Sequence, residues 1–152
     1  MTLTEFAVSL RPVAPGDAAF FYTTRRDGFR DYSEAAFGPW RDDVQRAHAA
    51  RDVAELPFEI VEHRGAPIGY FLVLREPDHL FLDEIALVPA VRCRGLGGAL
   101  VRLAMARARD AGLPLRLSVL FNNPAQRLYA RLGFVVTHVE HPRVKMTWTS
   151  SG

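Results

Sequence analysis

The chain has 152 residues, of which 49% are hydrophobic and 24% are charged, and its formal net charge at pH 7 is +2. These values are typical of a single globular domain covering residues 1–152, and they exclude the class of disordered, highly charged chains. Arginines and acidic residues alternate without a run of like charge, so we expect no nucleic-acid partner. The sequence contains one cysteine, its first residues lack the basic start and apolar stretch of a secretion signal, and no apolar run is long enough to cross a bilayer. These features predict a cytoplasmic protein without membrane contact.

The N-terminal third predicts one strand and two helices. Residues 6–13 alternate loosely and run into proline and glycine, which predicts a strand followed by a helix from about Asp17 to about Gly28. The stretch 31–52 predicts a second amphipathic helix, whose start lies near Gly38. Its apolar residues, at spacings of three and four, are Phe37, Trp40, Val44 and Ala47.

The pattern changes to β-structure after Pro57. The segments PFEIVEHR, PIGYFLVLRE and HLFLDEIALVP are rich in β-branched and aromatic residues. Turn residues at 65–66 and 77–78 separate them, so we expect an antiparallel meander of three strands.

The C-terminal half predicts two further helices between strands. A long helix follows Pro89 and ends at Gly112, because glycine commonly closes a helix. After the apolar segment LRLSVL, Asn123-Pro124 predicts a helix start and Gly133 its end, before the segments FVVTHVE and PRVKMTW. The element order predicts an α/β class protein, with a mixed sheet and helices on both faces.

A glycine-rich turn, VRCRGLGGAL, connects the third strand of the meander to the long helix. Gly95, Gly97 and Gly98 have no side chain to obstruct a ligand, and the first N–H groups of a helix lack internal partners. The helix dipole also favours an anion there, so a pyrophosphate could dock on the backbone. The P-loop and dinucleotide patterns do not fit, because no lysine follows and Leu100 stands at the third glycine position.

Three segments together resemble the GNAT superfamily of acetyl-CoA-dependent N-acetyltransferases. They are R-x-x-G-x-G from Arg92 to Gly97, NNPAQRLYARLGF from Asn122 to Phe134, and DEIALVP before the turn. The resemblance implies the GNAT fold, a mixed and mainly antiparallel twisted sheet of about seven strands, flanked by about four helices on both faces. It also implies transfer of an acetyl group from acetyl-CoA to a primary amine of a small molecule or peptide, by direct attack in a ternary complex and without a metal.

The resemblance implies a set of residues that bind CoA. The backbone of Leu87 and Val88 would pair with the pantetheine arm, although both residues also fit an ordinary buried strand. Asn122 would bond the same arm or simply cap a helix. The loop residues that would hold the pyrophosphate are Arg92, Cys93, Arg94, Gly95, Leu96, Gly97 and Gly98; Ala125 and Tyr129 complete the set.

The resemblance also suggests the catalytic groups. Tyr129 matches the general acid that protonates the departing CoA thiolate, although an aromatic residue at helical spacing also fits a core position. Asp83 is a candidate base, and Glu84 points to the opposite sheet face unless a bulge intervenes. Some relatives carry a glutamate where this chain has Ser118, so the base stays open between Asp83, Glu84 and a water chain that ends on a histidine.

Several points remain open at the level of sequence. A non-catalytic CoA-binding regulatory module with the same fold is the alternative function, because Ser118 is no general base. The acceptor amine and a homodimer through the terminal strands are likewise undecided. The aromatic residues Phe29, Tyr32, Phe37 and Trp40 lie in the region that shapes the acceptor pocket in similar proteins. Core packing explains most of them, and one or two could line the pocket.

Overall fold

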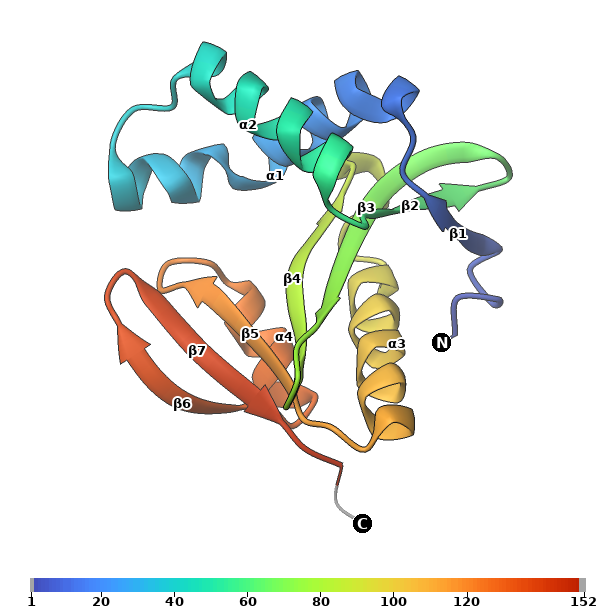
Figure 1. The fold of residues 1–152 in the computed structure, drawn as a ribbon, viewed down its shortest axis with the longest axis vertical. Helices are drawn as coiled ribbons and strands as arrows, with labels where there is room; N and C mark the ends of the chain where they lie inside the picture. Colours follow the sequence, from blue (N-terminus) through green and yellow to red (C-terminus); the bar gives the residue numbers. More distant parts are fainter. Residues whose placement is uncertain (1, 151–152) are drawn as a thin grey trace.

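The computed structural model describes residues 2–150, and these form one seven-stranded sheet with the order β1-β2-β3-β4-β5-β7-β6. Its strands are β1 (Val8–Pro12), β2 (Glu59–His63), β3 (Ala66–Arg75), β4 (Leu80–Leu87), β5 (Leu115–Leu120), β6 (Val135–Glu140) and β7 (Arg143–Trp148). Only the β4–β5 pair among them is parallel. The expected mixed, mainly antiparallel sheet is therefore confirmed (Figure 1).

Four α-helices in residues 2–150 cover the two faces of this sheet. They are α1 (Ala18–Phe37), α2 (Asp42–Glu55), α3 (Leu96–Ala111) and α4 (Ala125–Arg131). One buried cluster joins Phe21 of α1 and Ala49 of α2 to the sheet. A second cluster joins Leu100 of α3 to the other face, where Leu128 of α4 packs against it. Each face thus has its own core, and in Figure 1 the pair α1–α2 lies above the sheet while α3 stands beside β3 and β4.

The predicted boundaries of the first two helices are wrong. Helix α1 runs through Gly28 to Phe37, because a glycine inside a long helix lowers its stability without ending it. Gly38 ends the helix, with a φ of +93° that favours glycine. Helix α2 begins at Asp42 and buries Ala49, whereas Val44 is exposed.

The predicted ends of α3 and α4 agree with the structure. Gly112 follows α3 in the left-handed conformation with a φ of +70°, and its N–H donates to the carbonyls of Ala108 and Arg109. The prediction that Gly112 ends this helix is therefore confirmed. The side-chain Oδ1 of Asn123 accepts a hydrogen bond from the N–H of Ala125 at 2.9 Å. Asn123 therefore caps the start of α4, as the sequence predicts.

A β-bulge interrupts strand β4 in the middle. Leu72 of β3 pairs with Glu84, but the next residue, Val73, pairs with Leu82, so Asp83 is the extra residue. A bulge shifts the alternation of side chains between the two faces. Leu82 packs in the core beneath α3, while Glu84 turns toward α1. The side chains of Asp83 and Glu84 therefore both lie on the sheet face that α1 and α2 cover.

Candidate active site

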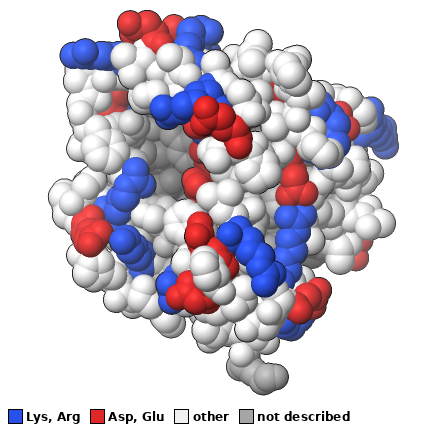
Figure 2. Space-filling model, viewed as in Figure 1, with Lys and Arg blue, Asp and Glu red and all other residues white. Residues whose placement is uncertain are grey.

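The parallel strands β4 and β5 separate after a short contact, which opens a pocket between them. They pair only from Leu80 to Leu82 and from Leu115 to Leu117. The rest of both strands lines a cavity of about 570 Å³, together with residues of α1, α2 and α4. Figure 2 shows a hollow on this face of the molecule with acidic and basic side chains at its rim. A cavity of this size suits a small-molecule substrate.

A second cavity of about 720 Å³ continues from the first across the start of α3. The two cavities have five lining residues in common: Leu87, Arg92, Gly97, Ala125 and Leu128. Together they form a path from the first turn of α3, past the end of β4, to the gap between β4 and β5. An elongated ligand can therefore reach from the glycine turn into the first pocket.

The glycine turn exposes backbone at the start of α3. Gly95 adopts the left-handed conformation with a φ of +86°, and α3 begins without a side-chain cap. A Cβ atom at Gly97 would have no heavy atom within 4 Å, so this glycine faces open space in the cavity. Free N–H groups at a helix start, beside open space, make a site for an anion such as phosphate.

Arginine side chains surround this anion site. Arg92 donates from Nε to the carbonyl oxygen of Leu87 at 2.9 Å, while its Nη2 is buried without a hydrogen-bond partner in the described chain. Arg102 and Arg131 line the second cavity from α3 and α4. Sequence reasoning missed both of them, although Arg102 lies one helical turn after Gly98 and so shares its face.

The other predicted CoA-binding residues lie in different surroundings. Cys93 is exposed and lines the second cavity. Leu96 is buried in the core, and the N–H of Val88 donates to the carbonyl of Ile68 at 2.9 Å. Arg94 and Asn122 line neither cavity.

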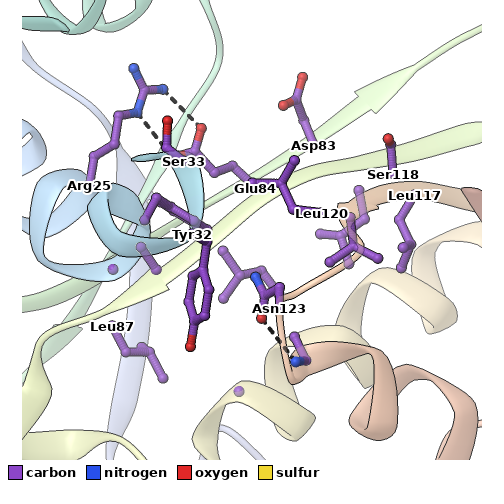
Figure 3. A pocket seen from close by; sticks show the side chains of 18 of the residues that line it. Arg25, Tyr32, Ser33, Asp83, Glu84, Leu87, Leu117, Ser118, Leu120 and Asn123 are labelled. Atoms are coloured by element: carbon purple, nitrogen blue, oxygen red, sulfur yellow. Dashed lines mark hydrogen bonds and ion pairs between the residues drawn. The ribbon is translucent and has the colours of Figure 1, made fainter. Parts of the chain in front are cut away.

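Asn122 instead links the start of α4 to α1. Its Nδ2 donates to the carbonyl of Tyr32 at 3.4 Å, and its Oδ1 is buried without a partner in the described residues. The neighbouring Asn123 lines the first pocket (Figure 3).

Glu84 is the centre of a partly buried ion-pair cluster. Arg25 of α1 donates to both of its carboxylate oxygens, at 3.1 and 2.9 Å, and also to Asp52 of α2 at 2.9 Å. The buried hydroxyl of Tyr70 also donates to Glu84. Burial, with the charge of Glu84, raises the pKa of Tyr70 well above its usual value, so this hydroxyl stays protonated. The cluster ties α1, α2, β3 and β4 together, and Glu84 is fully engaged in it.

Asp83 differs from its neighbour because its carboxylate has no ion pair in residues 2–150. Figure 3 shows Asp83 pointing away from the Arg25–Glu84 pair, beside Ser118 on the next strand. Desolvation and the charge of Glu84 raise the pKa of Asp83, against the opposing effects of Arg25 and Arg143. A free carboxylate with a raised pKa is a better proton acceptor than a paired one.

Two hydroxyl groups lie in the same pocket. Tyr129 lines it from α4, with its ring centroid 5.8 Å from that of Phe134, and burial raises its pKa to about 12. Its phenol is therefore protonated at neutral pH and can donate a proton. Ser118 lines the pocket from β5, and its Oγ is buried without a partner in the described residues. The residue pattern of β5 does not predict an unpaired hydroxyl at Ser118, since its burial depends on how the two strands separate.

The outer wall of the pocket comes from α1, α2 and β7. One or two of the aromatic residues in this region were expected at the pocket, but all four line it: Phe29, Tyr32, Phe37 and Trp40. Arg143, the first residue of β7, also lines it and was missed by sequence reasoning. In the described part of the chain, no group of three or more His, Cys, Asp or Glu residues could hold a metal ion. No helix in residues 2–150 has the length and apolarity to cross a membrane.

Comparison with protein families and curated sequences gives two matches. The model described as acetyltransferase (GNAT) family matches residues 20–134. The mycothiol acetyltransferase of Thermomonospora curvata is 32% identical over 136 residues, which cover 84% of this chain and 44% of the relative. The chain thus spans less than half the length of this curated relative.

Solved structures share the fold at low sequence identity. The PaiA N-acetyltransferase of Thermoplasma acidophilum in complex with coenzyme A has a TM-score of 0.74 at 14% identity, and the match covers 94% of this chain and 99% of the other. The yncA protein of Salmonella typhimurium with its cofactor acetyl-CoA has a TM-score of 0.59 at 23% identity, with 94% of each chain covered. These similarities support the fold described above.

Proposed function

Because the chain belongs to the GNAT acetyltransferase family, we propose that its single domain transfers the acetyl group of acetyl-CoA to a primary amine by direct attack in a ternary complex. The observation that carries this proposal is the gap between β4 and β5, which connects the exposed helix start at Gly97 with Asp83 and Tyr129. The gap brings an anion site, a free carboxylate and a protonated phenol into one continuous path.

The residues present fit a CoA molecule. The backbone at Gly95 and Gly97 would hold the pyrophosphate, and Arg102 and Arg131 would add positive charge. The unpartnered Nη2 of Arg92 is a further donor at the end of β4, where the pantetheine arm would pass. CoA supplies an activated thioester whose carbonyl carbon accepts a nucleophile.

The residues of this pocket can complete the proton balance of the reaction. Asp83 takes a proton from the ammonium group of the acceptor, directly or through a water, and leaves a neutral amine. The amine nitrogen forms a bond to the thioester carbonyl carbon, and the carbon–sulfur bond breaks. Tyr129 gives a proton to the departing sulfur and regains one from the nitrogen through solvent. Asp83 then releases its proton to solvent, and the products are an N-acetylated acceptor, free CoA and one proton.

Asp83 is the base in this proposal, and Glu84 is a structural residue. The three hydrogen bonds that Glu84 accepts from Arg25 and Tyr70 occupy its oxygens, whereas Asp83 faces the pocket unpaired. Ser118 contributes a buried hydroxyl beside it, which suits a water that relays the proton.

Calorimetric titration with acetyl-CoA, free CoA and NAD, followed by a CoA-release assay with a panel of amines, tests the proposal. We expect both CoA ligands to bind with micromolar affinity, NAD not to bind, and CoA release to require an amine. Absence of CoA binding would refute the site. Binding without amine-dependent release over a broad panel would favour a regulatory CoA-binding module instead.

A further inference from the structure

Most charged groups in the first pocket neutralise one another. Arg25 pairs with Glu84 and Asp52, both at 2.9 Å. Arg51 is 3.9 Å from the same Asp52, whose other oxygen Arg25 already holds. These four side chains form one connected group between α1, α2 and β4. Their charges balance, so they leave little charge free to bind a ligand.

Two charged side chains of opposite sign remain free at the acceptor end. Asp83 projects from β4 and Arg143 from the start of β7, and both line the pocket. Within residues 2–150 neither has an ion pair. Arg143 acts on Asp83 electrostatically, since its charge is among those that lower the pKa of that carboxyl against burial and Glu84. The acceptor end of the pocket therefore offers one anion and one cation across the same space, while Arg92 lies at the other end, beside Leu87.

Arg143 occupies a defined position at the mouth of the pocket. Its guanidinium carbon lies 5.7 Å from the ring centroid of Phe37, at the end of α1. This contact joins β7 to α1 at the protein surface, where the Phe37 side chain is 59% exposed. A guanidinium on an aromatic face keeps its N–H donors free at its edge, where they can bind a carboxylate with two hydrogen bonds.

We propose that the acceptor is a zwitterionic amine of the amino acid type, whose ammonium group meets Asp83 and whose carboxylate meets Arg143. The inference rests on the proposed function, because it names the acceptor class of the same site. An acceptor with a second positive charge would meet Arg143 with like charge, and an acceptor without a carboxylate would leave its donors unused. Opposite charges at the two ends also orient the amine toward the gap between β4 and β5.

Matched acceptor pairs test this inference. The kcat/KM for CoA release is measured with α-, β- and γ-amino acids and with the primary amide of each, which keeps the amine and removes the negative charge. We expect the best amino acid to exceed its amide about tenfold, the value of one charge-assisted contact of about 1.4 kcal/mol at a partly exposed site. The series also reports the distance between amine and carboxylate that the pocket accepts.

The variant Arg143→Gln should lower kcat/KM for the amino acid about tenfold and bring acid and amide to a similar level. Lys145→Gln is the matched control, because Lys145 lies on the same strand and pairs with Glu140 outside the pocket. It should keep the preference of the unaltered protein. Amides that serve as well as acids would overturn the inference and leave acetyl transfer to amines intact. If no amine in either series releases CoA, the proposed function fails and the inference fails with it.

Discussion

The two ends of the continuous cavity are built from different parts of the chain. At the proposed CoA end, consecutive backbone groups from Gly95 to Gly98 would form the site. At the acceptor end, single side chains from β4, β7 and two helices converge, with Asp83 and Arg143 the free charges among them. A site made of consecutive backbone leaves a motif in the sequence, whereas a site made of distant side chains leaves none. Substitutions at each end test whether the two ends have these separate roles.

The largest effect should come from the acceptor end. Asp83→Asn removes the free carboxylate that we assign as base, so kcat should fall by about 10³-fold while the Kd for acetyl-CoA stays the same. CoA release and calorimetry measure the two quantities. Asp78→Asn is the matched control, since Asp78 lies in the turn before β4 and its carboxylate pairs with His79, outside the pocket. Retained turnover in Asp83→Asn would place the base elsewhere.

The same variant should make the protein more stable. The folded state raises the pKa of Asp83, mainly by desolvation, so it binds the proton more tightly than the unfolded chain does. Ionised Asp83 therefore costs stability at neutral pH, and this cost disappears as the pH falls below the ordinary pKa of aspartate. Asp83→Asn should raise Tm at pH 7, and the gain should shrink on acidification. Loss of stability at pH 7 would instead assign Asp83 a structural role.

Tyr129→Phe acts where the two ends meet. It removes the proposed proton donor for the leaving thiolate but keeps the ring that packs near Phe134, so kcat should fall about 10²-fold with acetyl-CoA affinity preserved. Steady-state kinetics and calorimetry distinguish this result from a packing defect, which would weaken binding and lower Tm. Leu132→Ala, a truncation of a residue on the same core face, is expected to show that packing defect.

Glu84→Gln tests whether Glu84 has a structural role that its neighbour Asp83 lacks. Gln cannot balance the charge of Arg25, which keeps only Asp52 at 2.9 Å, so the free energy of unfolding should fall by about 2 kcal/mol. Urea denaturation measures it. Glu140→Gln weakens exposed contacts with Lys145 and His138, which are screened by solvent, so it should change stability far less. Equal effects of the two substitutions would show that the partly buried cluster around Glu84 adds little to stability.

The contrast between Asp83 and Glu84 also shows the limit of sequence reasoning. The motif from Arg92 to Gly97, the element order and the cap at Asn123 were predictable because each depends on a few adjacent residues. The bulge at Asp83 leaves a weaker signal, a break in the apolar alternation between Leu82 and Ile85. Had this break been interpreted as a bulge, Asp83 and Glu84 could have been predicted on the same face of the sheet.

The acceptor wall was predictable only in part. Its aromatic residues lie near one another in the sequence, and one or two of the four were expected there. Arg143 is 106 positions after Phe37, the difference of their residue numbers, and the two meet only because β7 lies beside β5 in the sheet. The length of α1 was missed because Gly28 reads locally as a helix end, whereas packing of α1 on the sheet continues the helix.

Gly97→Val tests the CoA end by adding a side chain to the open backbone. A Cβ there meets no atom within 4 Å, so the free energy of unfolding should not fall, but the Kd for acetyl-CoA should rise at least about tenfold because the branch enters the anion site. Gly112→Ala gives the opposite pattern at the other end of α3. Its φ of +70° strains alanine, which should cost about 1 kcal/mol of stability and leave the Kd unchanged.

The smallest effect is a shift in the pH profile that connects Arg143 to Asp83. Four neighbours act on the Asp83 carboxyl: Glu84 and Asp52 raise its pKa beyond the effect of burial, while Arg25 and Arg143 lower it. Removing the positive charge in Arg143→Gln should raise the pKa further, so the acidic limb of kcat/KM should move to higher pH.

An amino acid amide is the right acceptor for this measurement, because it has no carboxylate to lose its contact with Arg143, and its own amine pKa is the same for both proteins. Added salt should reduce the shift, since Arg143 is exposed and its charge is screened. Lys145→Gln should leave the limb in place, because Lys145 is not among the groups that act on Asp83. A limb that stays fixed in Arg143→Gln would mean that the group titrating in catalysis is not Asp83, and the acceptor end would then need a different base.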